Sequence, residues 1–303
     1  MSTNWLGMRR REFLAVAAAV VLPGLAGAQT KSGPKALAGS QLYGWGQYYE
    51  RMGKSVARYL DEVLSGVRDA GFDYAEGNLD TADPERNGVF AAKCKARGLR
   101  PVSLYTGARL HEQRASDQTV KAILAAAPVC RDAGFEILNC NADVSGRLKT
   151  DEELATQAAG FSALGEGLRK LGMRLGVHHH TPEMRDHAKE FHYNFQHSEK
   201  SLVGFCYDVH WVFRGGVMPE EALAKYGERV VSWHLRQSRQ GIWWEDLDAG
   251  DVDYDAVSRY AREHGLAPYF TVELALENGT KVTRSVVENH RRSREYVRRV
   301  FGA

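Results

Sequence analysis

A unit of helix, glycine and strand recurs along the chain, and this repeat constrains the fold more than any other feature. Six glycines each come at or just before a short, largely apolar, strand-like segment: Gly71, Gly98, Gly134, Gly172, Gly227 and Gly265. A glycine just past a helix end adopts the left-handed conformation that terminates the helix, so these positions predict helix ends followed by strands. They are 27–38 residues apart, except for one interval of 55 that contains a further strand-like segment, 203–210.

With a first strand expected at 41–47, the chain has eight strands that alternate with helices. Such an order with short connections predicts a single (β/α)8 TIM barrel, an α/β fold with a closed parallel sheet. A doubly wound sheet is the alternative, but the segment after the first strand has no GxGxxG phosphate turn. The long connection 181–200 is expected to form a lid or short helix over the barrel mouth. Pro128 predicts a kink or break in its helix.

The N-terminus resembles a twin-arginine export signal. Arg10 and Arg11 precede an apolar run, 15–22, which is too short to span a bilayer stably, and Ala26-Gly27-Ala28 fits a cleavage site. We therefore predict a signal peptide at 1–28, a linker at 29–40 and the barrel domain at 41–303, with the mature protein in the periplasm or otherwise exported by the twin-arginine route. An uncleaved membrane anchor is the alternative for this segment.

The charge of the mature chain gives no case for a polyanionic partner. Removal of residues 1–28 takes three Arg and one Glu from 40 basic and 38 acidic residues, so the two signs balance. We therefore expect no nucleic-acid partner and no membrane association after signal cleavage. The four cysteines match no zinc motif, and it stays open whether Cys94 and Cys130 pair or are buried free thiols.

Polar residues gather where the predicted strands end. In a TIM barrel the C-terminal ends of the strands meet at the catalytic face. Period 2 places one set of side chains at these ends: Glu76, Asn139, Asn141, His178, His180, Asp208, His210, His234, Arg236 and Glu273. A single strand histidine is usually a hydrogen-bonded structural residue, but four successive strands with histidine and carboxylate ends are costly to bury unpaired. A divalent cation offsets that cost, and mixed imidazole and carboxylate donors suit Zn, Mn, Fe, Co or Ni.

The chain resembles the xylose-isomerase-like barrel superfamily, in particular its sugar phosphate isomerase/epimerase branch. The resemblance covers about residues 42–277 and rests on four motifs in order: GVHHHTPE at 176–183, DVHW at 208–211 with Gly215-Gly216, His234-Leu235, and Val272-Glu273. It implies a TIM barrel that acts on a sugar.

The resemblance also implies one divalent metal ion, of unknown identity, held by His178, Asp208, His234 and Glu273. Many relatives have Glu at the position of His178, where two metal-bound carboxylates exchange protons on opposite faces of the sugar. The pair is incomplete here, and Arg236-Gln237 replaces the usual Lys-Asp.

The predicted chemistry is proton abstraction next to a ketone that the metal polarises. Glu273 is the candidate base, and His180 or His210 is the candidate for the second proton transfer. Candidate substrate-binding residues are Arg236, Glu76, Trp45 and Glu183. For these residues the alternatives are a salt bridge inside the barrel for Arg236, core packing for Trp45, and orientation of a histidine for Glu183.

These residues predict a metal-dependent isomerase or epimerase of a keto-sugar or polyol derivative. A metal-dependent lyase that cleaves a 3-keto-glycoside is the alternative within enzymes. An apurinic-site nuclease would need a basic groove and more metal ligands, and a non-catalytic sugar-binding barrel would need no metal. The sequence leaves open which sugar is bound and whether the chain forms a homo-oligomer.

Overall fold

A computed structural model describes residues 35–303. The predicted signal peptide lies outside the described residues, as does the first half of the predicted linker, 29–34. Within 35–303, no helix combines the length and the apolar character that a membrane crossing needs.

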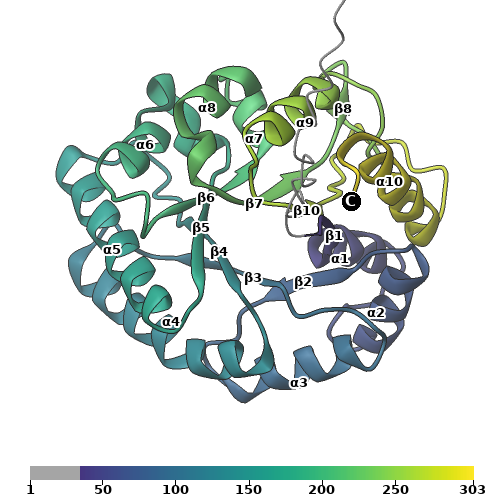
Figure 1. Ribbon diagram of the computed structural model, residues 1–303, viewed down its shortest axis with the longest axis horizontal. Helices are drawn as coiled ribbons and strands as arrows, with labels where there is room; N and C mark the ends of the chain where they lie inside the picture. Colours follow the sequence, from purple (N-terminus) through teal and green to yellow (C-terminus); the bar gives the residue numbers. More distant parts are fainter. Residues whose placement is uncertain (1–34) are drawn as a thin grey trace, which may run out of the picture. The chain divides into compact units, whose positions relative to one another are not determined.

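Eight parallel strands form a closed barrel, as the sequence predicts, and helices surround it (Figure 1). Each strand pairs with its chain neighbour, and β1 closes the barrel against β10. The barrel strands are β1 Leu37–Gln41, β2 Tyr74–Asn78, β3 Ser103–Ala108, β4 Ile137–Ala142, β5 Arg174–His178, β6 Gly204–Asp208, β7 Val230–Leu235 and β10 Tyr269–Val272.

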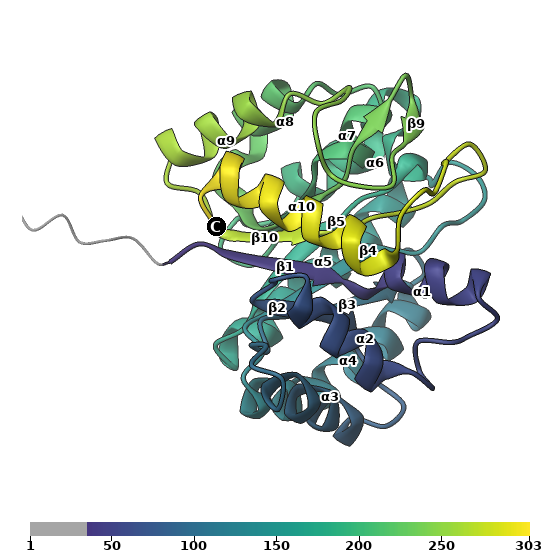
Figure 2. The same cartoon turned by 90° about the vertical axis from the view of Figure 1, so that its right-hand side faces the viewer.

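The helices pack around the barrel, and α10 lies along β1 and β10 (Figure 2). The α-helices are α1 Leu42–Arg51, α2 Leu60–Asp69, α3 Glu85–Lys95, α4 Gln113–Ala133, α5 Asp151–Lys170, α6 Arg185–Gln196, α7 Val209–Arg214, α8 Pro219–Tyr226, α9 Tyr254–Glu263 and α10 Val286–Phe301. Two 3-10 helices, η1 Thr181–Met184 and η2 Gly227–Arg229, and a small hairpin, β8 Ser238–Arg239 with β9 Ile242–Trp243, complete the described elements. The long connection after β5 thus forms η1 and α6.

The predicted glycine caps account for five of the helix ends in the described residues. Five of the six glycines have a positive φ, from 58° at Gly265 to 104° at Gly134. Gly227 differs: its φ is −54°, and it begins η2. A side chain at the other five positions would be strained, so these glycines fix where each helix stops.

The expected break at Pro128 is wrong. Helix α4 runs through Pro128 from Gln113 to Ala133. Helix α5 begins with a capping box: Thr150 Oγ1 accepts from the Glu153 amide at 3.2 Å, and the Glu153 carboxylate accepts from the Thr150 amide at 2.8 Å. This reciprocal pair satisfies two of the free amides at the helix start.

The first strand lies four residues earlier than predicted. β1 covers Leu37–Gln41, inside the segment expected as linker, and the aromatic segment after it is helix α1. Gln41 ends the strand and caps the helix, because its side-chain oxygen accepts from the Tyr43 amide. The barrel therefore starts before residue 41, and the side chains of 42–47 do not alternate as strand residues would.

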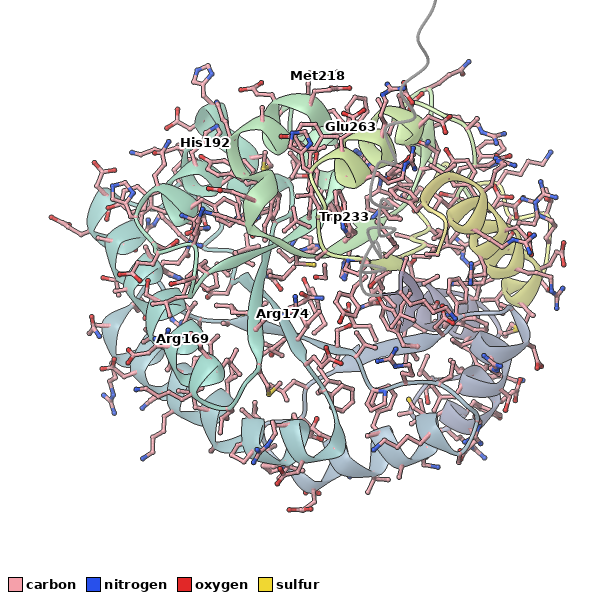
Figure 3. The ribbon with its side chains drawn as sticks, viewed as in Figure 1. Arg169, Arg174, His192, Met218, Trp233 and Glu263 are labelled. Carbon is pink, nitrogen blue, oxygen red and sulfur yellow. The ribbon has the colours of Figure 1, made fainter. Side chains whose placement is uncertain are left out.

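The barrel interior is layered. Large aromatic residues on the outer side of the strands pack under the helices: Trp233, labelled in Figure 3, contacts Phe270 of β10 and Phe301 of α10. Inside the barrel, a small apolar group of Leu37, Tyr74, Val102 and Ile137 forms one layer.

A buried polar layer follows, in which Ser103 and Asn139 both donate to Glu76, and Ser232 donates to Asn139. This layer supports the residues at the strand ends. Cys94 and Cys130 are both buried and free.

Candidate metal centre

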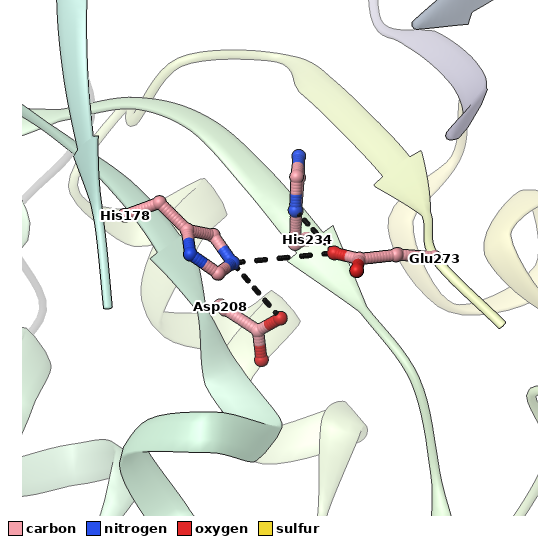
Figure 4. Close-up of side chains that lie close together, drawn as sticks. All are labelled: His178, Asp208, His234 and Glu273. Atoms are coloured by element: carbon pink, nitrogen blue, oxygen red, sulfur yellow. Dashed lines mark hydrogen bonds and ion pairs between the residues drawn. The ribbon is translucent and has the colours of Figure 1, made fainter. Parts of the chain in front are cut away.

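Four buried side chains converge at the C-terminal ends of neighbouring strands (Figure 4). His178 ends β5 and Asp208 ends β6. His234 is the second-last residue of β7, and Glu273 directly follows β10. One donor atom from each lies within 4.8 Å of the others. His178 Nε2 is 3.3 Å from Asp208 Oδ2 and 4.0 Å from Glu273 Oε2. The four residues that the resemblance implies as metal ligands thus lie together in the structure.

Two neighbours fix the imidazole of His234. Its Nδ1 lies 2.6 Å from Glu273 Oε2, and its Nε2 lies 2.7 Å from Glu76 Oε1. Burial lowers the pKa of His234, but the charges of Cys206, Glu76 and Glu273 outweigh burial and raise it well above its usual value. Glu76 itself is held by Ser103 at 2.5 Å and Asn139 at 2.8 Å. A histidine with a carboxylate on its outer nitrogen and its other nitrogen facing the centre is typical of a metal ligand.

His178 has a comparable outer partner in Tyr105. The Tyr105 hydroxyl lies 3.3 Å from His178 Nδ1 and donates to Asn141 Oδ1 at 2.8 Å. His178 Nε2 therefore faces the centre, while Nδ1 faces β3. The role of Tyr105 as a partner of His178 was not predicted from the sequence. The only available signal is that Tyr105 lies on the strand next to the one that carries Asn141.

Arg236 supplies the positive charge of the centre. Its Nη2 lies 2.7 Å from Asp208 Oδ2 and 2.8 Å from Glu273 Oε2, and the side chain is buried. The guanidinium also lies over Trp211 and Trp243, 5.3 and 5.0 Å from the ring centroids. Stacking on aromatic faces stabilises a buried guanidinium.

These charges keep both carboxylates ionised. Burial alone would raise the pKa of Glu273, but Arg236 and His234 outweigh it and lower that pKa to about 2. The pKa of Asp208 is also lowered, because Arg236 and His178 outweigh burial.

The donor set fits a divalent cation. Two imidazole nitrogens and two ionised carboxylates are ligands that Zn and neighbouring transition metals accept. Both histidines have an outer partner that orients the ring toward the centre. Arg236 lies close to the same two carboxylate oxygens, so the guanidinium and a cation would compete for them.

A cavity of about 880 Å³ opens beside these residues. Of the predicted site residues, Glu76, His180, Arg236 and Glu273 line it. The other lining residues near the centre are Asn78, Tyr105, Asn141, Trp211 and Trp243. The imidazole of His180 packs edge-on against His178, with centroids 4.6 Å apart. Burial lowers the pKa of His180 to about 3, with a smaller contribution from His178, so the ring is neutral at neutral pH.

His210 does not face this cavity. It belongs to helix α7, not to a strand, and both ring nitrogens are engaged: Nε2 lies 2.8 Å from Ser238 Oγ, and Nδ1 accepts from Trp243 Nε1 at 3.2 Å. Ser238 in turn donates to Asp251 at 2.6 Å. The chain of contacts ties α7 to the β8–β9 hairpin, so His210 orders this part of the mouth and His180 is the histidine that meets the cavity.

Trp45 is also away from the cavity. Its indole Nε1 donates to Ser40 at 2.9 Å, and its ring is fully buried and stacked on His290, with centroids 4.3 Å apart. The predicted strand 41–47 would have turned Trp45 inward, but helix α1 turns it toward α2 and α10. The structure therefore gives Trp45 a packing role.

Glu183 belongs to η1, is buried, and does not line the cavity. Its Oε2 accepts from the His180 amide at 3.1 Å, while its Oε1 is buried without a hydrogen-bond partner. Burial raises the pKa of Glu183 to about 7, and the nearby Glu190 adds to this rise. Glu183 thus holds the backbone of His180 and does not touch the cavity.

Glu183 should make stability depend on pH. Because its pKa is higher in the folded than in the unfolded state, its carboxyl favours folding at low pH, and this contribution is lost as pH rises from about 4.5 through about 7. Glu183→Gln should raise the free energy of unfolding above pH 8 by about 1–3 kcal/mol and change it little at pH 4. Urea unfolding at both pH values measures this. The exposed Glu199→Gln is the control, and a Glu183→Gln variant that is less stable at pH 8 would contradict the prediction.

Residues 64–299, more than half of the chain, match the family described as Xylose isomerase-like TIM barrel. The chain belongs to this family.

Among curated proteins, the chain is 24% identical to an inosose dehydratase of Geobacillus kaustophilus over 60% of this chain and 63% of the relative. It is 25% identical to an inosose dehydratase of Clostridium perfringens over 41% of this chain and 48% of the relative. The matches thus span less than two thirds of the length of these relatives.

Solved structures with the same fold include a sugar phosphate isomerase/epimerase from Parabacteroides distasonis, with a TM-score of 0.70 and 17% identity over 91% of this chain and 98% of that chain. A 3-keto-D-glucoside 4-epimerase from E. coli has a TM-score of 0.65 and 14% identity over 88% of this chain and all of that chain. At these identities the likeness concerns the fold alone.

Proposed function

We propose that this protein is a metal-dependent enzyme that removes the proton next to the ketone of a keto-sugar or keto-polyol. The observation that carries the proposal is the group of His178, Asp208, His234 and Glu273 beside the cavity. A divalent ion held there would act as a Lewis acid toward the ketone oxygen. Membership of the xylose isomerase-like family and the inosose dehydratase relatives support a sugar or polyol substrate.

The residues of the chain have separate roles in this proposal. Glu273 is ionised, lies at the cavity wall and takes the proton. Arg236 lies beside it and is placed to bind a substrate oxygen as a double donor. Trp211 and Trp243 line the same end and exclude water from the reacting carbon. Return of the proton to a neighbouring carbon or to the opposite face gives isomerisation or epimerisation.

Elimination is the second candidate. It is favoured because His178 stands where many relatives have a second carboxylate. Of the four residues of the group, Glu273 is then the one carboxylate that lines the cavity and can exchange a proton with the substrate. In a 3-keto-glycoside, Glu273 would take the proton next to the ketone and the C–O bond one carbon further would break. The oxygen would leave with the bonding electrons and take up a proton, which gives an unsaturated ketone and an alcohol. Dehydration, as the names of the inosose dehydratase relatives describe, is elimination of water of the same kind.

Proton NMR in deuterated buffer tests the proposal. We expect deuterium at the carbon next to the ketone when a panel of keto-sugars, inososes and 3-keto-glucosides is incubated with the protein. New sugar signals would indicate isomerisation or epimerisation, and vinyl signals would indicate elimination. Chelator treatment should abolish exchange, and a stoichiometric divalent metal should restore it. Undiminished exchange in protein shown by elemental analysis to be metal-free would contradict the metal dependence.

A further inference from the structure

We infer that the cavity binds a substrate of two parts: a reacting ring at the metal centre and an uncharged, apolar group in a second arm of the cavity. This inference rests on the proposed function, since it names the class of substrate for the same site. The arm, called here the apolar arm, comprises the apolar lining residues Leu42, Tyr43, Gly46, Val56, Ala57, Leu60 and Phe90, while Gln47, Glu50 and Ser55 from the same segments also line the cavity. The apolar residues lie in α1, in the segment before α2, at the first position of α2, and in α3.

The size of the cavity exceeds what one ring needs. Its volume of about 880 Å³ lies near the upper end of the range of roughly 300–1,000 Å³ that encloses drug-sized ligands. A single six-carbon ring at Glu273 and Arg236 would leave the apolar arm empty. A ligand that extends from the centre past Tyr105 and Asn78 to α1 would fill it.

The two ends of the cavity differ in chemistry. The end at the metal centre is lined by carboxylate, guanidinium and imidazole groups. In the apolar arm, Leu42, Val56, Leu60 and Phe90 are only partly covered by the core, and Tyr43 is 52% exposed. Half-covered aliphatic and aromatic side chains beside a cavity gain free energy when an apolar group covers them. The arm therefore suits the aromatic or aliphatic aglycone of a glycoside.

Gly46 keeps the arm open. It lies inside helix α1, where glycine is unfavourable relative to alanine. A Cβ built at Gly46 would have one neighbour within 4 Å, Val56 Cγ2 at 3.7 Å. A larger side chain would therefore extend into the arm without meeting the backbone.

The charges along the cavity oppose a phosphorylated ligand. Of the lining residues, the two arginines are both paired: Arg236 with Asp208 and Glu273, and Arg86 with Asp80 and Asp83 at 3.6 and 3.4 Å. Four acidic residues, Glu50, Glu76, Asp80 and Glu273, line the same cavity. A phosphate would meet more negative than free positive charge, so the second part of the substrate is expected to be uncharged.

The experiment compares the binding of phenyl β-D-glucoside, methyl β-D-glucoside and cellobiose by isothermal titration calorimetry. These probes have no ketone next to an acidic C–H, so they report binding without turnover. We expect the phenyl glucoside to bind at least about tenfold more tightly than the methyl glucoside, because the phenyl ring buries apolar surface in the arm. Gly46→Leu should remove this preference.

Gly88→Leu is the matched control. Gly88 also lies inside a helix, α3, and its Cβ would likewise meet one valine methyl, Val129 Cγ1 at 3.7 Å, but it does not line the cavity. Both variants should keep or raise the Tm, since each replaces a glycine inside a helix. Gly88→Leu should keep the preference for the phenyl glucoside.

Several results would overturn the inference. These are equal affinities for phenyl and methyl glucosides, no binding of any probe, tighter binding of cellobiose than of the phenyl glucoside, or a phenyl preference that survives Gly46→Leu. Failure of the proposed function would look different. The phenyl preference would persist, but no keto-sugar would exchange its proton with solvent.

Discussion

Replacement of Glu273 by glutamine should lower the rate of solvent exchange at the carbon next to the ketone by about 10²–10⁴-fold, the usual contribution of a general base. Glutamine has nearly the same shape but cannot accept the proton. Glu273 is the carboxylate of the group that lines the cavity, and Arg236 and His234 keep it ionised. Exchange is measured by NMR in deuterated buffer at saturating metal, so that weaker metal binding does not imitate loss of the base.

The control for this variant is Glu277→Gln, which removes a carboxylate that pairs with Arg214 at 3.0 Å outside the cavity. It should leave exchange within about twofold of wild type. Circular dichroism checks that both variants fold. Exchange that continues unchanged in Glu273→Gln would exclude Glu273 as the base and direct attention to His180, the histidine that lines the cavity.

Replacement of His234 by alanine should weaken the binding of a divalent metal by well over 100-fold. His234 is fully buried and would supply Nδ1 as a direct ligand, whereas loss of an outer partner typically costs about 10–100-fold. Glu76→Gln, which changes the outer partner of His234, should therefore weaken metal binding by about 10–100-fold. Competition with a coloured chelator measures both affinities without reference to activity.

His264→Ala, at the exposed end of α9, is the matched control and should bind metal as wild type does. We therefore expect metal affinity to be lowest in His234→Ala, intermediate in Glu76→Gln and highest in His264→Ala. This order follows from the distance of each side chain to the centre. Equal affinity in His234→Ala and wild type would mean that His234 is not a ligand.

The barrel could be predicted because its signals are local. A glycine with a positive φ at the end of a helix is required by the backbone alone, and five of the six glycines used for the prediction have this conformation. The four residues of the centre belong to the set of polar residues expected at the strand ends, and the resemblance to the xylose-isomerase-like barrels singled them out from that set. They end strands, and the ends of parallel strands meet in any closed barrel.

The errors arise where one residue ends a strand and begins a helix. Asp208 closes β6 and also caps α7, since its Oδ1 accepts from the Trp211 amide at 2.8 Å. The alternation of the strand predicts an inward side chain at His210, but His210 lies beyond this point, in helix α7. Gln41 has the same double role between β1 and α1, which turned Trp45 away from the cavity. The alternation of inward and outward side chains in a strand does not indicate at which residue the strand ends.

The partners of Arg236 could not be predicted from the sequence. Its side chain is long enough to reach solvent, a substrate or the neighbouring strands, and only the folded barrel places Asp208 and Glu273 within 2.8 Å of it. Export by the twin-arginine route stays a prediction, since residues 1–34 lie outside the described part of the chain.

The ion pairs of Arg236 would separate the assembly of the barrel from the binding of the proposed metal. Two carboxylates buried without a counter-charge would oppose folding until a cation bound, and the protein would then depend on metal supply to fold at all. With a guanidinium already between Asp208 and Glu273, each of the two carboxylates has a positive partner from this chain itself. Binding of the proposed metal would then be a reversible exchange of one positive partner for another, which could take place after folding and be repeated during the lifetime of the molecule.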